Sequence, residues 1–408
     1  MTIDRSSLIN RLRAYAFCHG LAFHALLLSV HLKTHLLGDS HEALSLVYGI
    51  QVLALLATES FSGILSEMIG CWSMLRLCGL VRIGALGCLG MAIIVPSQLQ
   101  QLRLPLLVIW SLGEGVARAL YSGSDIDIIY SLSPNKAVAQ HHLSVQHAMW
   151  PLAMVLACLA TNITPDDRPQ YFAIQVGASC ASAALGLWVV WPIIEEDDKR
   201  KDRIIVAIDD VWKIASLLRP DRVVAENIQA LRSVWACTHT RRSWKYALMF
   251  ALLSETLNKV RPFWFPPRTT TLAMCLAFGG SFFGSLVAGS FACVRSRPRL
   301  PLLCYACAPI LWTLAIAWET DFLLYTTCLL VSVAFGVHKN HFYQQLLSNS
   351  DVRLTKTALL STLNLSTQVV HALWMCAIVS PLLDWRPQLL APFACASSLV
   401  LATFLYIV

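Results

Sequence analysis

Long apolar runs, separated by short charged or turn-forming clusters, cover most of the 408-residue chain. About 20 consecutive apolar residues form a helix long enough to cross the hydrocarbon core of a bilayer, which is about 30 Å thick. The pattern predicts twelve such helices, at residues 12–37, 43–67, 74–95, 104–131, 138–163, 171–194, 244–265, 269–293, 299–318, 322–347, 355–381 and 388–407. We therefore expect an all-α integral membrane protein with 12 transmembrane helices.

One long polar segment divides the apolar runs into two equal sets. It spans residues 195–243 and opens with the charged run Glu195-Glu-Asp-Asp-Lys-Arg-Lys-Asp-Arg. The predicted organisation is an N-terminal six-helix bundle at 1–194, a linker at 195–243 and a C-terminal six-helix bundle at 244–408.

Composition supports the membrane assignment and excludes several other classes. Hydrophobic residues make up 56% of the chain, charged residues 13%, and the mean hydropathy is +0.60. A soluble domain carries about a quarter charged residues. The composition excludes disorder, a coiled coil and a nucleic-acid-binding domain. We find no nucleophile elbow, zinc motif or phosphate-binding glycine loop, so we expect neither an enzyme nor a cofactor.

The basic residues are distributed unevenly along the chain. With twelve spans, both termini and the linker lie on one side of the membrane, and most of the 31 Lys and Arg residues fall on that side. Cytoplasmic segments of membrane proteins carry an excess of Lys and Arg. We expect cytoplasmic termini in a cell (inner or plasma) membrane, and the net charge of +7 then requires no acidic partner.

The cysteine and histidine residues do not form a metal-binding pattern. Nearly all of the 14 cysteines lie inside apolar runs, including the close pair Cys304 and Cys307, and behave there as small hydrophobic residues. His142 and His147 are five positions apart, so they do not share a helix face. No metal site is predicted.

A short motif between the second and third predicted spans identifies a family. The matching positions are Gly63, Glu67, Gly70 and Leu75. Their spacing resembles the signature of the major facilitator superfamily, in which the glycines allow close helix approach and a tight turn. The basic positions of that signature hold uncharged residues here, and Arg76 is out of register.

Two further stretches are similar to bacterial 12-helix efflux members of the superfamily. They are Ser122–Leu132 at the end of the fourth predicted span and Arg353–Asn364 at the start of the eleventh. The span 138–163 has Trp150-Pro151 but lacks the glycine pair common in drug exporters, which weakens the interpretation as an antiporter without excluding it.

The resemblance implies a secondary active transporter that works by alternating access between two bundles. We favour proton-coupled export of a small organic metabolite, drug or siderophore-like compound by a monomer in the lipid bilayer. The alternatives are a proton-coupled importer of a small organic solute and a non-transporting membrane sensor or partner with the same fold.

Ionisable residues inside predicted spans are the main candidates for function, because lipid does not tolerate them without a partner or a wet cavity. Glu114 and Arg118 lie one turn apart, and either bind substrate or protons or form a structural pair. Glu255 lies near mid-depth of its span, and Glu59 lies nearer the cytoplasmic side. For both, a structural hydrogen bond or ion pair is the alternative. The resemblance places the fourth and seventh spans at the central cavity.

Three further residues complete the predicted substrate and proton cavity, and a second group forms the predicted gate. The cavity residues are His24, Lys339 and Asn364. The gate and signature loop comprise Gly63, Glu67, Gly70, Asp125 and Asp127. For Asp125 and Asp127, interaction with helix ends or with the cytoplasmic gate is the favoured role. We expect Arg82, on a peripheral span, to pack or to extend toward the interface.

Overall fold

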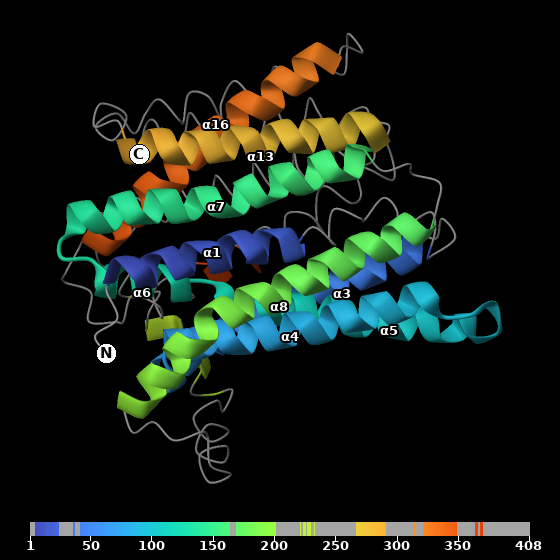
Figure 1. Cartoon of the computed structure of the whole chain (residues 1–408), viewed down its shortest axis with the longest axis horizontal. Helices are drawn as coiled ribbons and strands as arrows, with labels where there is room; N and C mark the ends of the chain where they lie inside the picture. Colours follow the sequence, from blue (N-terminus) through green and yellow to red (C-terminus); the bar gives the residue numbers. More distant parts are fainter. Residues whose placement is uncertain are drawn as a thin grey trace. The chain divides into compact units, whose positions relative to one another are not determined.

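The computed structural model describes residues 5–23, 41–163, 169–200, 267–290 and 321–348, together with short pieces between and after them that include 364–365. All regular structure in these residues is helical (Figure 1). The helices are α1 (Arg5–Phe23), α3 (His41–Ile69), α4 (Cys71–Ile94), η3 (Ser97–Leu102), α5 (Arg103–Tyr121), α6 (Ser124–Leu132), α7 (Lys136–Ile163), α8 (Pro169–Arg200), α13 (Pro267–Ser290) and α16 (Asp321–Ser348). Five segments of the described chain are long and apolar enough to cross a membrane.

The predicted spans of the N-terminal bundle all coincide with described helices, at least in part, and 269–293 and 322–347 coincide with α13 and α16. Four predicted spans, 244–265, 299–318, 355–381 and 388–407, lie wholly or almost wholly outside the described residues. The total of twelve spans therefore stays a prediction.

The predicted span 104–131 lies within one long apolar segment, Gln98–Leu132, but its helix is interrupted. Helix α5 ends at Tyr121 and α6 begins at Ser124, with Gly123 between them at φ 80° and ψ −20°. A residue in this left-handed conformation cannot continue a right-handed helix, and glycine adopts it without a steric penalty. The apolar pattern continues through the break, so periodicity alone did not reveal it.

The described helices form two compact units. The first contains α1, α3, α4, α5, α6 and α8, and the second contains α7, α13 and α16. Helix α7, which precedes α8 in the chain, thus packs with helices from the second half of the sequence. The predicted boundaries at 194 and 243 stay a prediction, although α8 continues as helix to Arg200, past the predicted start of the linker.

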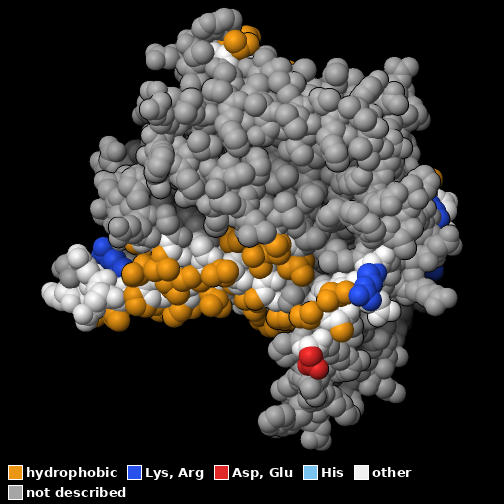
Figure 2. All heavy atoms as spheres, turned by 180° about the vertical axis from the view of Figure 1, so that it is seen from behind, with side chains coloured by type: hydrophobic (Ala, Val, Ile, Leu, Met, Phe, Trp, Pro, Cys, Tyr) orange, Lys and Arg blue, Asp and Glu red, His pale blue; other side chains and the backbone are white. Residues whose placement is uncertain are grey.

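The core of the first unit lies between α4, α5 and α8. It includes Leu86 and Leu89 of α4, Leu107 and Trp110 of α5, and Val176 of α8, all buried. The opposite faces of these helices expose large apolar side chains, including Leu80, Ile94, Ile109, Ile174 and Trp188. Figure 2 shows hydrophobic side chains gathered in a band with Lys or Arg near its ends. An apolar surface of this kind suits contact with lipid.

In the second unit, glycines allow α13 and α16 to approach closely. A methyl group built at Gly280 would lie 2.6 Å from the Leu329 carbonyl oxygen, and one at Gly336 would lie 2.7 Å from the Ser285 nitrogen. Small residues at helix contacts let backbones pack tightly where lipid supplies no hydrophobic driving force.

A glycine in the first unit gives a test of this packing. A methyl group at Gly115 would meet the Gln51 carbonyl oxygen and would lie 2.8 Å from Ala54 Cβ. Gly115→Ala is therefore expected to push α3 and α5 apart. The expected loss of stability is about 1–3 kcal/mol. Gly87→Ala is the matched control, because nothing lies within 4 Å of its added methyl group. Thermal unfolding in detergent would compare the two, and equal stability would contradict the tight α3–α5 contact.

Candidate functional site

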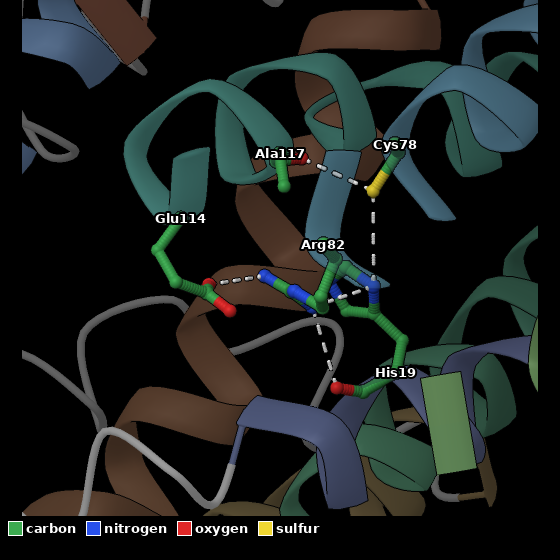
Figure 3. Close-up of polar contacts among 5 residues, drawn as sticks. All are labelled: His19, Cys78, Arg82, Glu114 and Ala117. Atoms are coloured by element: carbon green, nitrogen blue, oxygen red, sulfur yellow. Dashed lines mark hydrogen bonds and ion pairs between the residues drawn. The ribbon is translucent and has the colours of Figure 1, made fainter. Parts of the chain in front are cut away.

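The most deeply buried charges of the described chain form an ion pair in the first unit. Glu114 of α5 is 0% exposed and Arg82 of α4 is 1% exposed. Arg82 Nη2 lies 2.9 Å from Glu114 Oε2 (Figure 3). Each charge removes much of the desolvation cost of the other, which neither could bear alone in this apolar surrounding.

A third helix brings a histidine to the same guanidinium. Arg82 Nη1 lies 2.8 Å from both ring nitrogens of His19, on α1, and donates to the His19 carbonyl oxygen at 3.4 Å. Cys78, one turn before Arg82, donates its thiol to the Ala117 carbonyl oxygen at 3.2 Å. His19, Arg82 and Glu114 form what we call the buried ion cluster, which ties α1, α4 and α5 together.

Aromatic rings cover one side of the buried ion cluster. The His19 ring stacks on Tyr121 with centroids 4.1 Å apart, and Tyr15 stacks on Tyr121 at 6.2 Å. Tyr15 also donates its hydroxyl to the Leu75 carbonyl oxygen at 2.8 Å. These contacts fix the histidine ring and exclude water from the arginine.

Some polar atoms along the contact between α3 and α5 have no hydrogen-bond partner among the described residues. They are Glu114 Oε1, Gln51 Nε2 and Trp110 Nε1, all buried. Buried polar groups are almost always paired in folded proteins. Glu114 Oε1 can therefore accept a proton or a hydrogen bond from a polar solute.

A second polar group brings together two of the predicted cavity residues, Glu59 and Asn364, and a third, Arg118, lies near it. Glu59 of α3 is 1% exposed, and its carboxylate interacts with the side chains of Ser122 and Asn364. The Asn364 amide donates to the Ser122 hydroxyl, at the break between α5 and α6. Arg118 lies close enough for its charge to act on both Glu59 and His19. We call Glu59, Ser122 and Asn364 the break cluster.

The signature residues lie at the turn between α3 and α4. Gly70 has φ 84° and caps the start of α4, where the sequence predicts a tight turn. Gly63 is buried in α3, and Glu67 belongs to the same helix, but its side chain is outside the described set. The Cys71 thiol donates to Asp127 Oδ2 at 3.4 Å, which connects this turn to α6.

Asp125 and Asp127 begin α6, in its first turn. Asp125 accepts a hydrogen bond from the Tyr121 hydroxyl at 3.1 Å. Carboxylates in the first turn of a helix are favourable because they face its positive end. The two aspartates thus lie in the first turn of a separate helix, whereas the sequence placed them at the end of the span 104–131, and their role at the gate stays a prediction.

The second unit has its own buried polar contact. His147 Nδ1 of α7 lies 2.9 Å from Asn340 Oδ1 of α16, and Asn340 donates to the Gly336 carbonyl oxygen at 2.8 Å. Both side chains are buried, and Lys339 is near enough to act on His147 through its charge. Lys339 is the predicted cavity residue that the structure describes in this unit.

The structure gives Glu114 a partner that sequence reasoning missed. The predicted partner was Arg118, one turn along the same helix, whereas the ion pair is with Arg82 on α4. Arg82 was expected to pack at an interface of the two halves or to extend toward the membrane surface, and its burial contradicts the second role. An arginine in the middle of an apolar span is itself a signal for a buried carboxylate partner. His24 and Glu255 lie outside the described residues.

The described residues contain no group of three or more His, Cys, Asp or Glu side chains that could hold a metal ion.

Comparison with solved structures defines the fold. The chain is similar to a proton:xylose symporter of the major facilitator superfamily (TM-score 0.68, 11% identity, 99% of this chain and 96% of that one). It is similar to a bacterial homologue of the iron transporter ferroportin in an outward-facing state (0.68, 14%, 98% and 98%) and to a D-xylose–proton symporter (0.68, 13%, 100% and 98%). No protein-family model and no curated sequence matches the chain.

The fold is therefore that of the major facilitator superfamily, and five segments of the described residues are long and apolar enough to cross a membrane. The similar structures are transporters rather than enzymes.

Proposed function

We propose that the protein is a secondary active transporter that moves a small organic solute by alternating access. The observation that carries this proposal is the buried ion cluster. An arginine and a carboxylate inside an apolar helical unit are costly, and in membrane proteins such pairs mark solute and proton pathways. The superfamily fold and the partnerless oxygen of Glu114 support the same role.

Within this class we propose coupling to protons. A carboxylate that releases its arginine when it gains a proton changes the relative energy of two conformations, and only such a difference can shift their populations. Glu114 in the buried ion cluster and Glu59 in the break cluster are the described candidates for this group. His24, Glu255 and Lys339 remain proposals as substrate- or proton-binding residues.

We favour export, with both termini in the cytoplasm and the chain acting as a monomer in the cell membrane. The second candidate is uptake by symport. It draws support from the similar structures that are described as proton:xylose and D-xylose–proton symporters.

Everted membrane vesicles from cells that produce the full chain would test the proposal. A panel of radiolabelled sugars, amino acids, organic acids and cationic dyes would be offered with and without a pH gradient. A transporter is expected to accumulate at least one solute, and a protonophore should abolish the gradient-driven part. Accumulation in everted vesicles indicates export, whereas uptake by intact cells alone indicates symport. The proposal would be contradicted if no solute moved faster into everted vesicles or intact cells that contain the protein than into the same preparations without it.

Glu255 can be tested in the same assay although its surroundings are not described. Glu255→Gln is expected to reduce transport by more than about tenfold, which corresponds to about 1.4 kcal/mol in the rate-limiting barrier, with normal membrane insertion. Lys259 lies four residues after Glu255 and is the partner expected if Glu255 forms only a structural ion pair, so Lys259→Gln is the control. Wild-type transport by Glu255→Gln would remove Glu255 from the site.

A further inference from the structure

A second arginine of α4 has a well-defined position that the transport proposal does not use. Arg76 belongs to the first turns of α4, and its guanidinium carbon lies 4.0 Å from the ring centroid of Trp191 on α8. Both side chains are partly exposed. A guanidinium stacked on an indole keeps its N–H donors at the edge free to bind an anion.

A neighbouring helix brings another arginine to the same end of α8. Arg11 of α1 donates from Nη1 to the Val189 carbonyl oxygen at 3.3 Å, two residues before Trp191. Tyr15, one turn after Arg11, donates to Leu75, the residue before Arg76. The contact puts Tyr15 and Leu75 at one level, so Arg11 lies one turn before that level on α1 and Arg76 one residue after it on α4, both at the end of the unit where α8 holds Val189 and Trp191.

From the arginines toward the middle of the helices, the surface beside the contact between α4 and α8 consists of exposed apolar side chains. Leu80, four residues after Arg76 and about 6 Å further along α4, is 46% exposed. Trp188, on the same face of α8 as Trp191, is 72% exposed. The helices are close here, because a methyl group at Gly79 would lie 3.2 Å from Leu187 Cδ1.

We propose that this surface binds one anionic phospholipid, with the headgroup phosphate at Arg76 and Arg11 and the acyl chains along Leu80 and Trp188. We call it the lipid site. Two observations select this occupant. Arg76 stacks on an aromatic ring at the end of α8 that Arg11 also contacts, and exposed apolar side chains continue from there toward the middle of the helices. A free anion would use only the first feature, and a second copy of the chain would not need the arginines.

The arginine at the other end of these helices lacks the features of the lipid site. The opposite end of α4 and α5 holds Arg103, which donates to the Val95 carbonyl oxygen at 3.1 Å and stacks on no described aromatic ring. Anionic lipids are concentrated in the cytoplasmic leaflet, and the predicted orientation places Arg11 and Arg76 there.

Native mass spectrometry of the full-length protein in detergent tests the lipid site. Phosphatidylglycerol or phosphatidylcholine would be titrated into the micelles, and the bound lipid retained at fixed collision energy would be counted. Wild-type protein is expected to retain phosphatidylglycerol in preference to phosphatidylcholine. Arg76→Gln is expected to reduce this retention about fivefold, as the loss of one basic contact implies.

Arg103→Gln is the matched control, because it removes a half-buried arginine from the other end of the same helices and should leave retention unchanged. Trp188→Ala provides a second test on an exposed position where folding is not at risk, and a smaller loss of phosphatidylglycerol is expected. Equal retention by wild type and both site variants would overturn the proposal. So would equal binding of the two lipids, displacement of the lipid by inorganic phosphate, or a dimer in place of the lipid-bound monomer.

Discussion

Replacing Glu114 with glutamine is expected to slow transport by more than about tenfold and to destabilise the protein more than any other single neutral substitution in the described chain. The reason is Arg82, which is 1% exposed and would keep its charge without a carboxylate partner. Removing one member of a buried ion pair costs about 3–5 kcal/mol, because the other is left uncompensated.

Replacing the other partner of the ion pair, in Arg82→Gln, should reduce stability less. In Arg82→Gln the remaining group is a carboxylate, which can become neutral by binding a proton, whereas a guanidinium cannot lose its proton in a protein. The double variant Arg82→Gln/Glu114→Gln has no buried charge and is expected to recover most of the lost stability without recovering transport.

Thermal unfolding in detergent, together with flux in vesicles, would separate the two effects. The order expected for stability is wild type, the double variant, Arg82→Gln and last Glu114→Gln. A Glu114→Gln protein as stable as wild type would show that the ion pair is not needed for folding. A double variant with wild-type flux would show that the pair is only structural.

The break cluster is expected to give the second large effect. Glu59→Gln and Asn364→Ala should each reduce transport several-fold, because Glu59 on α3 and Asn364 near the end of the sequence meet at Ser122, where α5 ends. Residues in one hydrogen-bonded group couple by about 0.5–3 kcal/mol in a double-mutant cycle. The double variant should therefore be less impaired than the product of the two single effects.

Initial transport rates of the four proteins would measure this coupling. A parallel cycle with Glu59→Gln and Ser182→Ala is the control, because Ser182 is a half-buried residue of α8 whose hydroxyl donates to the Ala178 carbonyl oxygen of the same helix. Additive effects in the first cycle, as in the control, would exclude a shared function for Glu59 and Asn364.

The apolar pattern was enough to predict the fold class, because helices that cross a bilayer must satisfy their own backbone and expose apolar side chains. The signature around Gly63 and Gly70 pointed to the superfamily whose fold the structure shows. The break at Gly123 was missed, because a single glycine inside an apolar run is compatible with a continuous helix. Only its φ of 80° shows that the helix ends there.

The site was harder to predict than the fold. Glu114 and Arg118 share a helix face, so sequence spacing favoured a pair between them, but Arg82 on the adjacent helix α4 reaches Glu114 instead. Spacing along one helix says nothing about which residues of neighbouring helices meet. His19 was passed over for His24 for the same reason, because depth in a span does not give the direction of a side chain.

Solute-driven proton movement in proteoliposomes tests the transport mechanism most directly. The purified chain would be reconstituted with a trapped pH-sensitive dye, and the solute found in the vesicle screen would be added outside. Wild-type protein is expected to change the internal pH on addition of solute, and Glu114→Gln to slow this change by more than about tenfold. A solute that crosses through the wild-type protein with no pH change, or an equal pH change in both proteins, would contradict proton coupling through the buried ion cluster.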